Sequence, residues 1–281
     1  METPDEPLPE GDSARAISDA RQAAGSQQPD LTGTVVLISG GGRGLGRLLA
    51  AELAKQGAAV GLLARSAAQL AAAVAEIERA GGIAAAAAAD VTDRASLVVA
   101  VDELTARLGP PDVLVNNAGI GGPVGPLWDT DPQEWIGTFD VNVTGAFELS
   151  RIVLRQMVAR EHGRIINITS NSAVYRWPLL SAYAASKAAL VKLSETLAFE
   201  TRRYGVAVLS FDPGLPPSGH GADPALATRL LVRLAAGHGD RLSGRHLTVA
   251  DDLDAVLANI DRVRRDDLHY LLLRTREGRY N

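Results

Sequence analysis

The chain has 281 residues, of which 46% are hydrophobic and 22% are charged, a composition typical of an ordinary globular protein. Its 33 acidic residues outnumber its 28 basic ones, and the net charge of −5 argues against a broad nucleic-acid interface. The absence of cysteine excludes disulfides, thiolate metal sites and cysteine nucleophiles. Because there is neither an apolar run of about 18 residues nor a signal-peptide core, we expect a cytoplasmic protein. The scarcity of lysine and the abundance of alanine favour a bacterial source.

The chain begins with an acidic segment, residues 1–30, which holds seven acidic residues and two arginines and almost no large apolar side chains. Such a segment cannot bury enough surface to offset the entropy lost on ordering, so it is predicted to be a disordered tail. No linker rich in Pro, Gly or Ser interrupts residues 31–249, which are therefore expected to form one domain. Residues 250–281 form a C-terminal extension.

From residue 34 onward, short apolar runs alternate with longer amphipathic ones. Buried strands are predicted at Val35–Ser39, Val60–Leu63, Ile83–Ala88, Val113–Val115, Arg164–Thr169, Val206–Phe211 and Arg245–Val249. Helices are predicted near residues 44–56, 66–80, 93–108, 132–161, 181–204 and 251–265, and Leu268–Leu273 could form one more strand. This alternation predicts right-handed βαβ crossovers, and hence an α/β domain with a parallel sheet and helices on both faces.

A glycine-rich turn joins the first predicted strand to the first helix, with the sequence Ser39-Gly40-Gly41-Gly42-Arg43-Gly44-Leu45-Gly46. Glycine is required where backbone turns tightly or approaches a pyrophosphate, and the N-terminus of the helix offers free N–H groups to phosphate. Strand, turn and helix follow in the required order, which predicts a dinucleotide site; the alternative is a glycine-rich loop without a ligand.

The end of the second strand indicates which dinucleotide is bound. A site that prefers NAD places a carboxylate there for the ribose 2′-hydroxyl, but this chain has Ala64 followed by Arg65. Arg65 and Arg43 of the glycine turn suit a 2′-phosphate, which a guanidinium binds with paired hydrogen bonds. NADP(H) is therefore the expected cofactor, unless both arginines are merely solvated.

Tyr183 and Lys187 lie four residues apart, and hence on one face of a predicted helix. Ser170 ends the fifth predicted strand, thirteen residues before Tyr183. With the glycine turn, these residues resemble the short-chain dehydrogenase/reductase family over residues 32–249. Two further matches support the resemblance: Asn116-Asn117-Ala118-Gly119 after the fourth strand, and Pro213-Gly214 after the sixth.

The resemblance implies a Rossmann-type, doubly wound domain with strand order 3-2-1-4-5-6-7, which in this family commonly forms dimers or tetramers. It also implies a catalytic tetrad, here called the tetrad: Asn142, Ser170, Tyr183 and Lys187. The cofactor-binding residues it implies, together with those expected from the residue patterns, are Gly40, Gly42, Arg43, Gly44, Leu45, Gly46, Arg65, Asp90, Val91, Asn117, Ala118, Gly119, Tyr183, Lys187, Pro213, Gly214 and Ser218.

The tetrad suits the interconversion of a ketone and a secondary alcohol. Hydride transfer to a carbonyl builds negative charge on oxygen, so Tyr183 is expected to donate a proton there. The nearby ammonium of Lys187 is expected to lower the pKa of Tyr183, and in the family it also holds the nicotinamide ribose. Ser170 is expected to bind the substrate oxygen. By resemblance, Asn142 positions a water that connects the relay to solvent.

The chain departs from the family after Pro213-Gly214, where it reads Leu215-Pro216-Pro217-Ser218. Ser218 can replace the usual threonine hydroxyl, but Pro216 has no N–H to offer the nicotinamide carboxamide. Because the helical pattern resumes by Pro224, a short lid and an open site are predicted. The C-terminal extension is expected either to pack on the surface or to contribute to the pocket or a dimer contact.

Four residues between Ser170 and Tyr183 are candidates for substrate contact: Asn171, Ser172, Arg176 and Trp177. Trp177 could stack on a substrate ring or simply pack. The five histidines are scattered without ligand spacing, so no metal site is expected. The main hypothesis is an NADP(H)-dependent enzyme that acts on a bulky or cyclic carbonyl compound. The alternative is a catalytically silent NADP-binding regulatory or assembly protein with the same fold.

Overall fold

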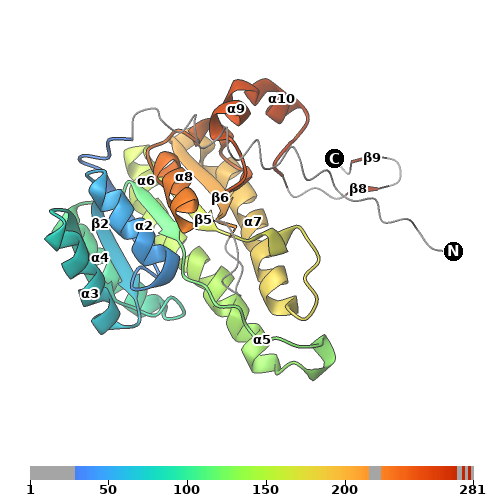
Figure 1. Ribbon diagram of the computed structural model, residues 1–281, viewed down its shortest axis with the longest axis horizontal. Coiled ribbons are helices and arrows are strands. Elements are labelled where there is room, and N and C mark those ends of the chain that lie inside the picture. The colour runs from blue at the N-terminus through green and yellow to red at the C-terminus, as the bar shows by residue number, and fades with distance from the viewer. Residues whose placement is uncertain (1–28, 215–222, 271–273, 276–277, 280–281) are drawn as a thin grey trace.

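The computed structural model describes residues 29–214, 223–270, 274–275 and 278–279. Its centre is a parallel seven-stranded sheet with the order β3-β2-β1-β4-β5-β6-β7, which confirms the order that the family resemblance implies (Figure 1). The strands are β1 Val35–Ser39, β2 Ala59–Ala64, β3 Ile83–Ala88, β4 Val113–Asn116, β5 Gly163–Ile168, β6 Val206–Asp212 and β7 His246–Thr248. They differ from the predicted strands by at most one residue at either end.

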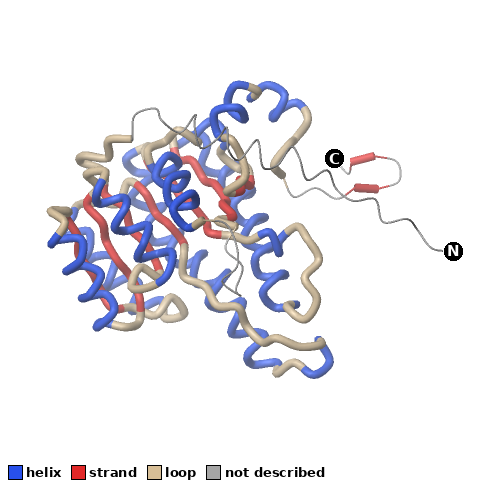
Figure 2. The backbone as a smooth tube through the Cα atoms, viewed as in Figure 1, coloured by secondary structure: helices blue, strands red, loops and turns tan. Residues whose placement is uncertain are grey.

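Helices cover both faces of this sheet, as Figure 2 shows. On one face α2 (Gly44–Lys55), α3 (Ala67–Arg79) and α8 (Pro224–Ala235) bury a continuous apolar core against the sheet. On the other face α4 (Arg94–Leu108), α6 (Gly145–Arg160) and α7 (Ser181–Thr201) bury a second core. Because strands buried on both sides must be apolar throughout, the strands read as short apolar runs rather than as alternating ones.

The predicted helix over 132–161 is wrong as a single element. It divides into α5 (Pro132–Phe139), a π-helical turn η2 (Asp140–Thr144) and α6. A π turn inserts one extra residue per turn, which the apolar periodicity of the sequence does not reveal, and such turns often occur at functional sites. Here it contains Asn142, whose side chain is buried. Four single 3₁₀ turns complete the connections: η1 Leu127–Asp129, η3 Asn171–Ala173, η4 Arg202–Tyr204 and η5 Asp240–Leu242.

The C-terminal extension packs on the core through two short helices, α9 (Leu253–Ala258) and α10 (Ile260–Arg265), where one helix was predicted. They lie at the end of the domain away from α3 and α4 (Figure 1) and bury Leu253, Ile260 and Val263 in the same core as α2 and α8. The strand predicted over Leu268–Leu273 is not formed by residues 268–270, which turn, while residues 271–273 lie outside the described part. Two short strands, β8 (Arg274–Thr275) and β9 (Gly278–Arg279), pair with each other.

Several predictions fall outside the described residues: the tail over 1–28, and Leu215, Pro216, Pro217 and Ser218 of the lid. In the part that the structure describes, no helix is long and apolar enough to cross a membrane. All seven strands point the same way, so their carboxyl ends meet at one edge of the sheet. In open α/β sheets this edge is where ligands bind, and the loops there carry the predicted site residues.

Candidate active site

The glycine turn between β1 and α2 is held close to the end of β4. Gly40 and Gly44 adopt φ values of +68° and +54°, which favour glycine over other residues. The Asn117 side chain donates hydrogen bonds to the carbonyls of Ser39 (3.0 Å) and Gly40 (3.3 Å). A Cβ at Gly46 would overlap the Gly40 carbonyl and the Asn117 amide. The turn therefore accepts only glycine where it crosses the loop after β4.

A Gly46→Ala variant is expected to lose about 1–3 kcal/mol of stability through this overlap, and to bind NADPH more weakly because the turn must shift. Gly137→Ala is the matched control, since Gly137 lies in α5 with open space around its Cβ position. Thermal denaturation and a fluorescence titration with NADPH measure both effects. A Gly46→Ala protein as stable and as tightly binding as Gly137→Ala would contradict this account of the turn.

A cavity of about 570 Å³ begins at this turn and follows the carboxyl edge of the sheet across β1, β2 and β4. Ten of the predicted cofactor residues line it: Gly40, Gly42, Arg43, Gly44, Arg65, Asp90, Val91, Asn117, Ala118 and Gly119. A Cβ at Gly42 would lie 3.1 Å from the Gln69 side chain, so glycine keeps this cradle open. The free N–H groups at the start of α2 suit phosphate. The residues present therefore fit a dinucleotide.

Other predicted cofactor residues do not line this cavity. Leu45 is partly buried in the core, Gly46 packs behind the turn, and Pro213 and Gly214 end the described part of the chain after β6. The sequence analysis missed six lining residues: Ala64 as a direct wall of the cavity, Ser66, Gln69, Ala89, Ile120 and Val141. Ala64 ends β2, Ala89 directly follows β3, and Ser66 and Gln69 lie at the start of α3. Because ligands bind at the carboxyl ends of the strands in open α/β sheets, these four could have been predicted.

The two arginines of the cavity differ in their surroundings. Arg43 is exposed at the start of α2, whereas Arg65 lies 3.9 Å from the carboxylate of Asp90. The backbone N–H of Thr92 donates to Asp90 and is the main reason that the pKa of this carboxyl is lowered. Asp90 thus stabilises the turn in which it lies and also lines the cavity. An exposed ion pair of this kind is weak and leaves the guanidinium available to an anionic ligand.

Ser170 and Tyr183 are brought together at the carboxyl edge of β5. Ser170 caps η3, where its Oγ accepts a hydrogen bond of 3.2 Å from the Ser172 amide. The Ser170 side chain lies close enough to the Tyr183 hydroxyl for hydrogen bonding to lower the pKa of Tyr183. Both hydroxyls therefore converge on one point, where a carbonyl oxygen of a substrate can be bound and protonated.

Lys187 is buried one helical turn after Tyr183, with only 4% of its surface exposed. Its Nζ donates a 2.8 Å hydrogen bond to the Ile168 carbonyl and lies 5.6 Å from the centre of the Tyr183 ring. Burial lowers the pKa of Lys187 to about 8, against the opposing effect of the Asp212 carboxylate. The ammonium is therefore the main form of this side chain only below about pH 8.

The expectation that Lys187 lowers the pKa of Tyr183 is not met in this structure. Burial raises the pKa of the phenol, the hydrogen bond with Ser170 lowers it, and the charge of Asp212 raises it again. Burial penalises the phenolate, and the Lys187 ammonium is engaged with a backbone carbonyl instead of the phenol oxygen. Tyr183 is consequently held as a neutral proton donor.

Asn142 joins the tetrad to the cofactor cavity. Its side chain accepts a hydrogen bond from the Ile120 amide (2.9 Å) and donates to the Ile120 carbonyl and to Ser186 Oγ (3.0 Å each). A Cβ at Gly119 would lie 3.3 Å from Asn142 Oδ1 and 3.5 Å from Lys187 Nζ. These hydrogen bonds tie the side chain of Asn142 to the loop after β4 and to α7. The amide group is therefore not free to bind the water that the family resemblance implies.

The substrate candidates separate into two groups. Asn171 lines a second cavity of about 210 Å³, and Ser172 is buried beside Ser170. Arg176 and Trp177 line neither this cavity nor the cofactor cavity. The second cavity also has walls that the sequence analysis missed: Val174, Tyr175, Val191, Asp212, His246, Thr248, Asp251, His269 and Tyr270.

Two histidines that are far apart in the sequence meet at this second cavity. The His246 amide donates to the His269 carbonyl at 2.7 Å, a contact that their separation in the sequence does not reveal. His246 Nδ1 lies 3.3 Å from Thr169 Oγ1 and 3.2 Å from Ser210 Oγ, and burial lowers the pKa of His246. Over the described ranges, no three His, Asp or Glu side chains are placed to hold a metal ion.

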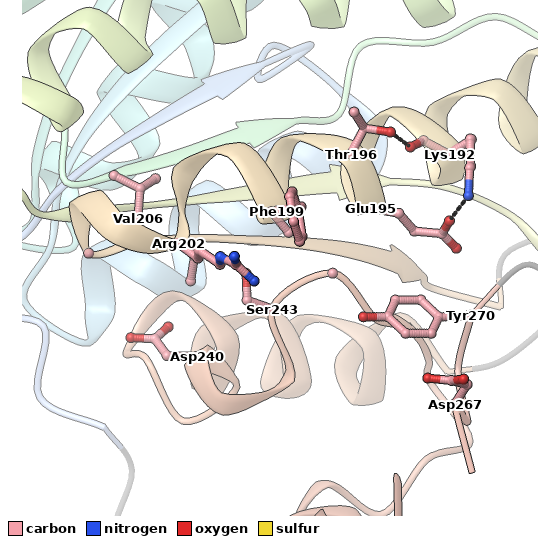
Figure 3. Close-up of a pocket in the computed structure, with 14 residues that line it drawn as sticks. Lys192, Glu195, Thr196, Phe199, Arg202, Val206, Asp240, Ser243, Asp267 and Tyr270 are labelled. Atoms are coloured by element: carbon pink, nitrogen blue, oxygen red, sulfur yellow. Dashed lines mark hydrogen bonds and ion pairs between the residues drawn. The ribbon is translucent and has the colours of Figure 1, made fainter. Parts of the chain in front are cut away.

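A separate groove of about 860 Å³ lies along the outer face of α7, and no member of the tetrad lines it. Figure 3 shows Phe199 of α7 and Arg202 of η4 on one side, and Asp240 and Tyr270 on the other. The Arg202 guanidinium lies 4.1 Å from the centre of the Phe199 ring. The chemistry-bearing side chains therefore lie at the carboxyl edge of the sheet and not in this groove.

Comparison with known proteins agrees with the site and the fold. The family model described as "short chain dehydrogenase" matches residues 34–221. The chain is 32% identical to the short chain dehydrogenase pigC of Monascus ruber over 89% of both chains. It is 34% identical to gluconate 5-dehydrogenase of Gluconobacter oxydans, over 66% of this chain and 72% of that relative.

The fold is also similar to that of a solved gluconate 5-dehydrogenase from Burkholderia cenocepacia in complex with NADP and tartrate. The two share a TM-score of 0.73 and 32% identity, over 80% of this chain and 96% of that one. The glycine turn, the hydroxyl pair and the buried lysine thus occur in a chain that is similar in sequence and in fold to these proteins. The chain belongs to the short-chain dehydrogenase family.

Proposed function

We propose that this protein is an NADP(H)-dependent oxidoreductase that interconverts a ketone and a secondary alcohol, acting mainly as a reductase. The observation that carries this proposal is the proximity of the Ser170 and Tyr183 hydroxyls, one helical turn from the buried Lys187. Through Gly119 this group adjoins the glycine-lined cavity that fits a dinucleotide. A cofactor and a carbonyl oxygen can therefore be held side by side.

When bound, the cofactor supplies the hydride. The part of this chain is to bind and protonate the oxygen: Ser170 donates a hydrogen bond to it, and Tyr183 donates the proton that converts it to a hydroxyl. Lys187 supplies positive charge near the phenol as the proton leaves. The raised pKa of Tyr183 keeps this proton in place until charge develops on the substrate oxygen, which suits the reductive direction.

The preference for NADP(H) rests on Arg43 and Arg65, which line the cavity beside the end of β2. Arg43→Ala and Arg65→Ala are each expected to raise the KM for NADPH roughly tenfold, because each removes one charged hydrogen-bond donor to the 2′-phosphate. The KM for NADH should stay nearly constant. Arg202→Ala, in the separate groove of α7, is the control. Equal effects on NADPH and NADH would contradict recognition of the 2′-phosphate.

The substrate side supports a bulky or cyclic carbonyl compound as the proposed class, since Asn171, which follows Ser170, lines a second cavity together with Tyr175. The proposed partner is a second or further copies of this chain, as a homodimer or homotetramer. Loss of NADPH absorbance against ketones that range from small acyclic to polycyclic compounds tests the function. NADPH binding without turnover of any ketone would favour the silent regulatory or assembly protein.

A further inference from the structure

Asp212 is a buried acid that the proposed reaction does not use. It is the last residue of β6, directly before Pro213-Gly214, and only 5% of its surface is exposed. Its Oδ1 accepts a 2.9 Å hydrogen bond from the Gly214 amide. Burying a carboxylate is costly unless hydrogen bonds or an opposite charge offset the loss of water. A nearby positive charge would add to the stabilisation that the Gly214 amide gives this carboxylate.

The strand register places Asp212 beside the catalytic lysine. Lys187 Nζ is bonded to the Ile168 carbonyl, and Ile168 is the register partner of Phe211 in the neighbouring strand. The Thr169 amide in turn donates to the Phe211 carbonyl at 2.8 Å. Because paired strands lie about 4.8 Å apart, the residue after Phe211 lies next to the backbone that anchors Lys187.

The side chain of Asp212 lies on the same face of the sheet as α7. Ser210 lies on that face because its hydroxyl meets the His246 ring, which also contacts Thr169. Asn167, two residues before Thr169, donates to Ser194 of α7 at 2.8 Å. Side chains two apart in a strand share a face, so Asp212 follows Ser210 toward α7. It also lines the second cavity together with Val191 of α7.

The charge of Asp212 acts on both titratable members of the tetrad. It raises the pKa of Lys187 and the pKa of Tyr183. Besides Asp212, the titratable side chains that line this cavity are Tyr175 after η3, His246 of β7, Asp251 of the turn after it, and His269 and Tyr270 of the C-terminal extension. Asp251 and His269 act on His246 but not on the tetrad.

We propose that Asp212 is a positioning residue of the tetrad, whose buried negative charge keeps Lys187 an ammonium and Tyr183 a neutral phenol. Ketone reduction requires both protonated forms at once, so one carboxylate extends the pH range in which the enzyme can donate its proton. This inference rests on the proposed function for its consequence, but the charge state of Lys187 can be measured without any turnover.

The test uses the scarcity of lysine, since the chain contains only Lys55, Lys187 and Lys192. Selective isotopic labelling of lysine in the full chain, followed by NMR over a range of pH, resolves three titrations. In the wild type Lys187 is expected to titrate near pH 8, while the side chains of Lys55 and Lys192, each 66% exposed, serve as internal references. Lys187→Met assigns the resonance.

Asp212→Asn keeps an acceptor for the Gly214 amide and removes the charge, so Lys187 should titrate about one pH unit lower. Asp212→Glu keeps the charge and should leave the titration within a few tenths of a unit of the wild type. Asp251→Asn removes a carboxylate of the same cavity that does not act on the tetrad, and should leave the Lys187 titration unchanged. Asp212→Ser is a second neutral variant in case Asp212→Asn does not fold.

The Asp212 variants are also tested by steady-state kinetics. The alkaline limb of kcat/KM for ketone reduction should move to lower pH in Asp212→Asn by the amount seen for Lys187, with near-normal activity at pH 6. An unchanged Lys187 titration in the folded neutral variants, or an equal shift in Asp251→Asn, overturns the inference. Absence of turnover in the wild type would count against the proposed function alone, because the titration would still report on Asp212.

Discussion

Replacing Tyr183 by Phe is expected to reduce kcat/KM for ketone reduction about 1,000-fold, within the range that general-acid catalysis contributes. Phe preserves the ring that packs in α7 and removes only the hydroxyl close to Ser170. Binding of NADPH should therefore change little. The measurement is the rate of NADPH oxidation at saturating cofactor, together with a fluorescence titration of NADPH binding.

Tyr204→Phe is the matched control for this loss, since Tyr204 lies in η4 at the far end of α7 and lines none of the cavities at the carboxyl edge. It should retain wild-type turnover. If Tyr183→Phe turned over ketone as fast as Tyr204→Phe, the proton would have to come from another group, and the assignment of Tyr183 as the acid would be wrong.

Replacing Lys187 by Met is expected to lower kcat/KM at pH 7 by about 100-fold or more, because an apolar side chain of similar length fills the buried space without supplying charge. The pH dependence of wild-type activity gives a second, independent test of the role of Lys187. Burial lowers the pKa of Lys187 to about 8, so the ammonium is present below that pH and is lost above it. Wild-type ketone reduction should therefore decline above about pH 8.

In Lys187→Met the residual activity should show no decline with a midpoint near pH 8, since the group that titrates there has been removed. Lys192→Met is the control: Lys192 is exposed, pairs with Glu195 at 2.8 Å and should leave both the rate and the profile unchanged. An alkaline limb that persists at the same pH in Lys187→Met would assign it to a different group.

The fold was predictable because its signals are local. Each strand is a short apolar run, and the helices between the strands show an amphipathic pattern instead. The glycine turn identifies the first strand–helix connection from its own sequence alone. Even the alanine-rich strand Ile83–Ala88 forms as predicted, paired along its whole length with β2. Ser170, Tyr183 and Lys187 were identified for the same reason, since their spacing lies within one helix or at the end of a strand, whereas Asn142 was identified by the family resemblance.

What the sequence did not reveal depends on contacts between distant segments. Asp212 reads as one more residue before a proline, and only the pairing of β5 with β6 places it beside Lys187. His246 and His269 meet because the C-terminal extension folds back onto β7. The pKa of Tyr183 was misjudged in direction because spacing on a helix shows a neighbouring charge but shows neither burial nor the carbonyl that binds the ammonium.

The central claim is that this chain transfers a hydride from a reduced nicotinamide cofactor to a carbonyl carbon, with Tyr183 supplying the proton. The most direct measurement is incubation of the wild-type protein and Tyr183→Phe with NADPH that carries deuterium at the transferable position, followed by mass analysis of the product alcohol. We expect one deuterium on the carbinol carbon with the wild type, and almost no product with Tyr183→Phe. An alcohol formed without deuterium, or equal labelled product from both proteins, would contradict the account.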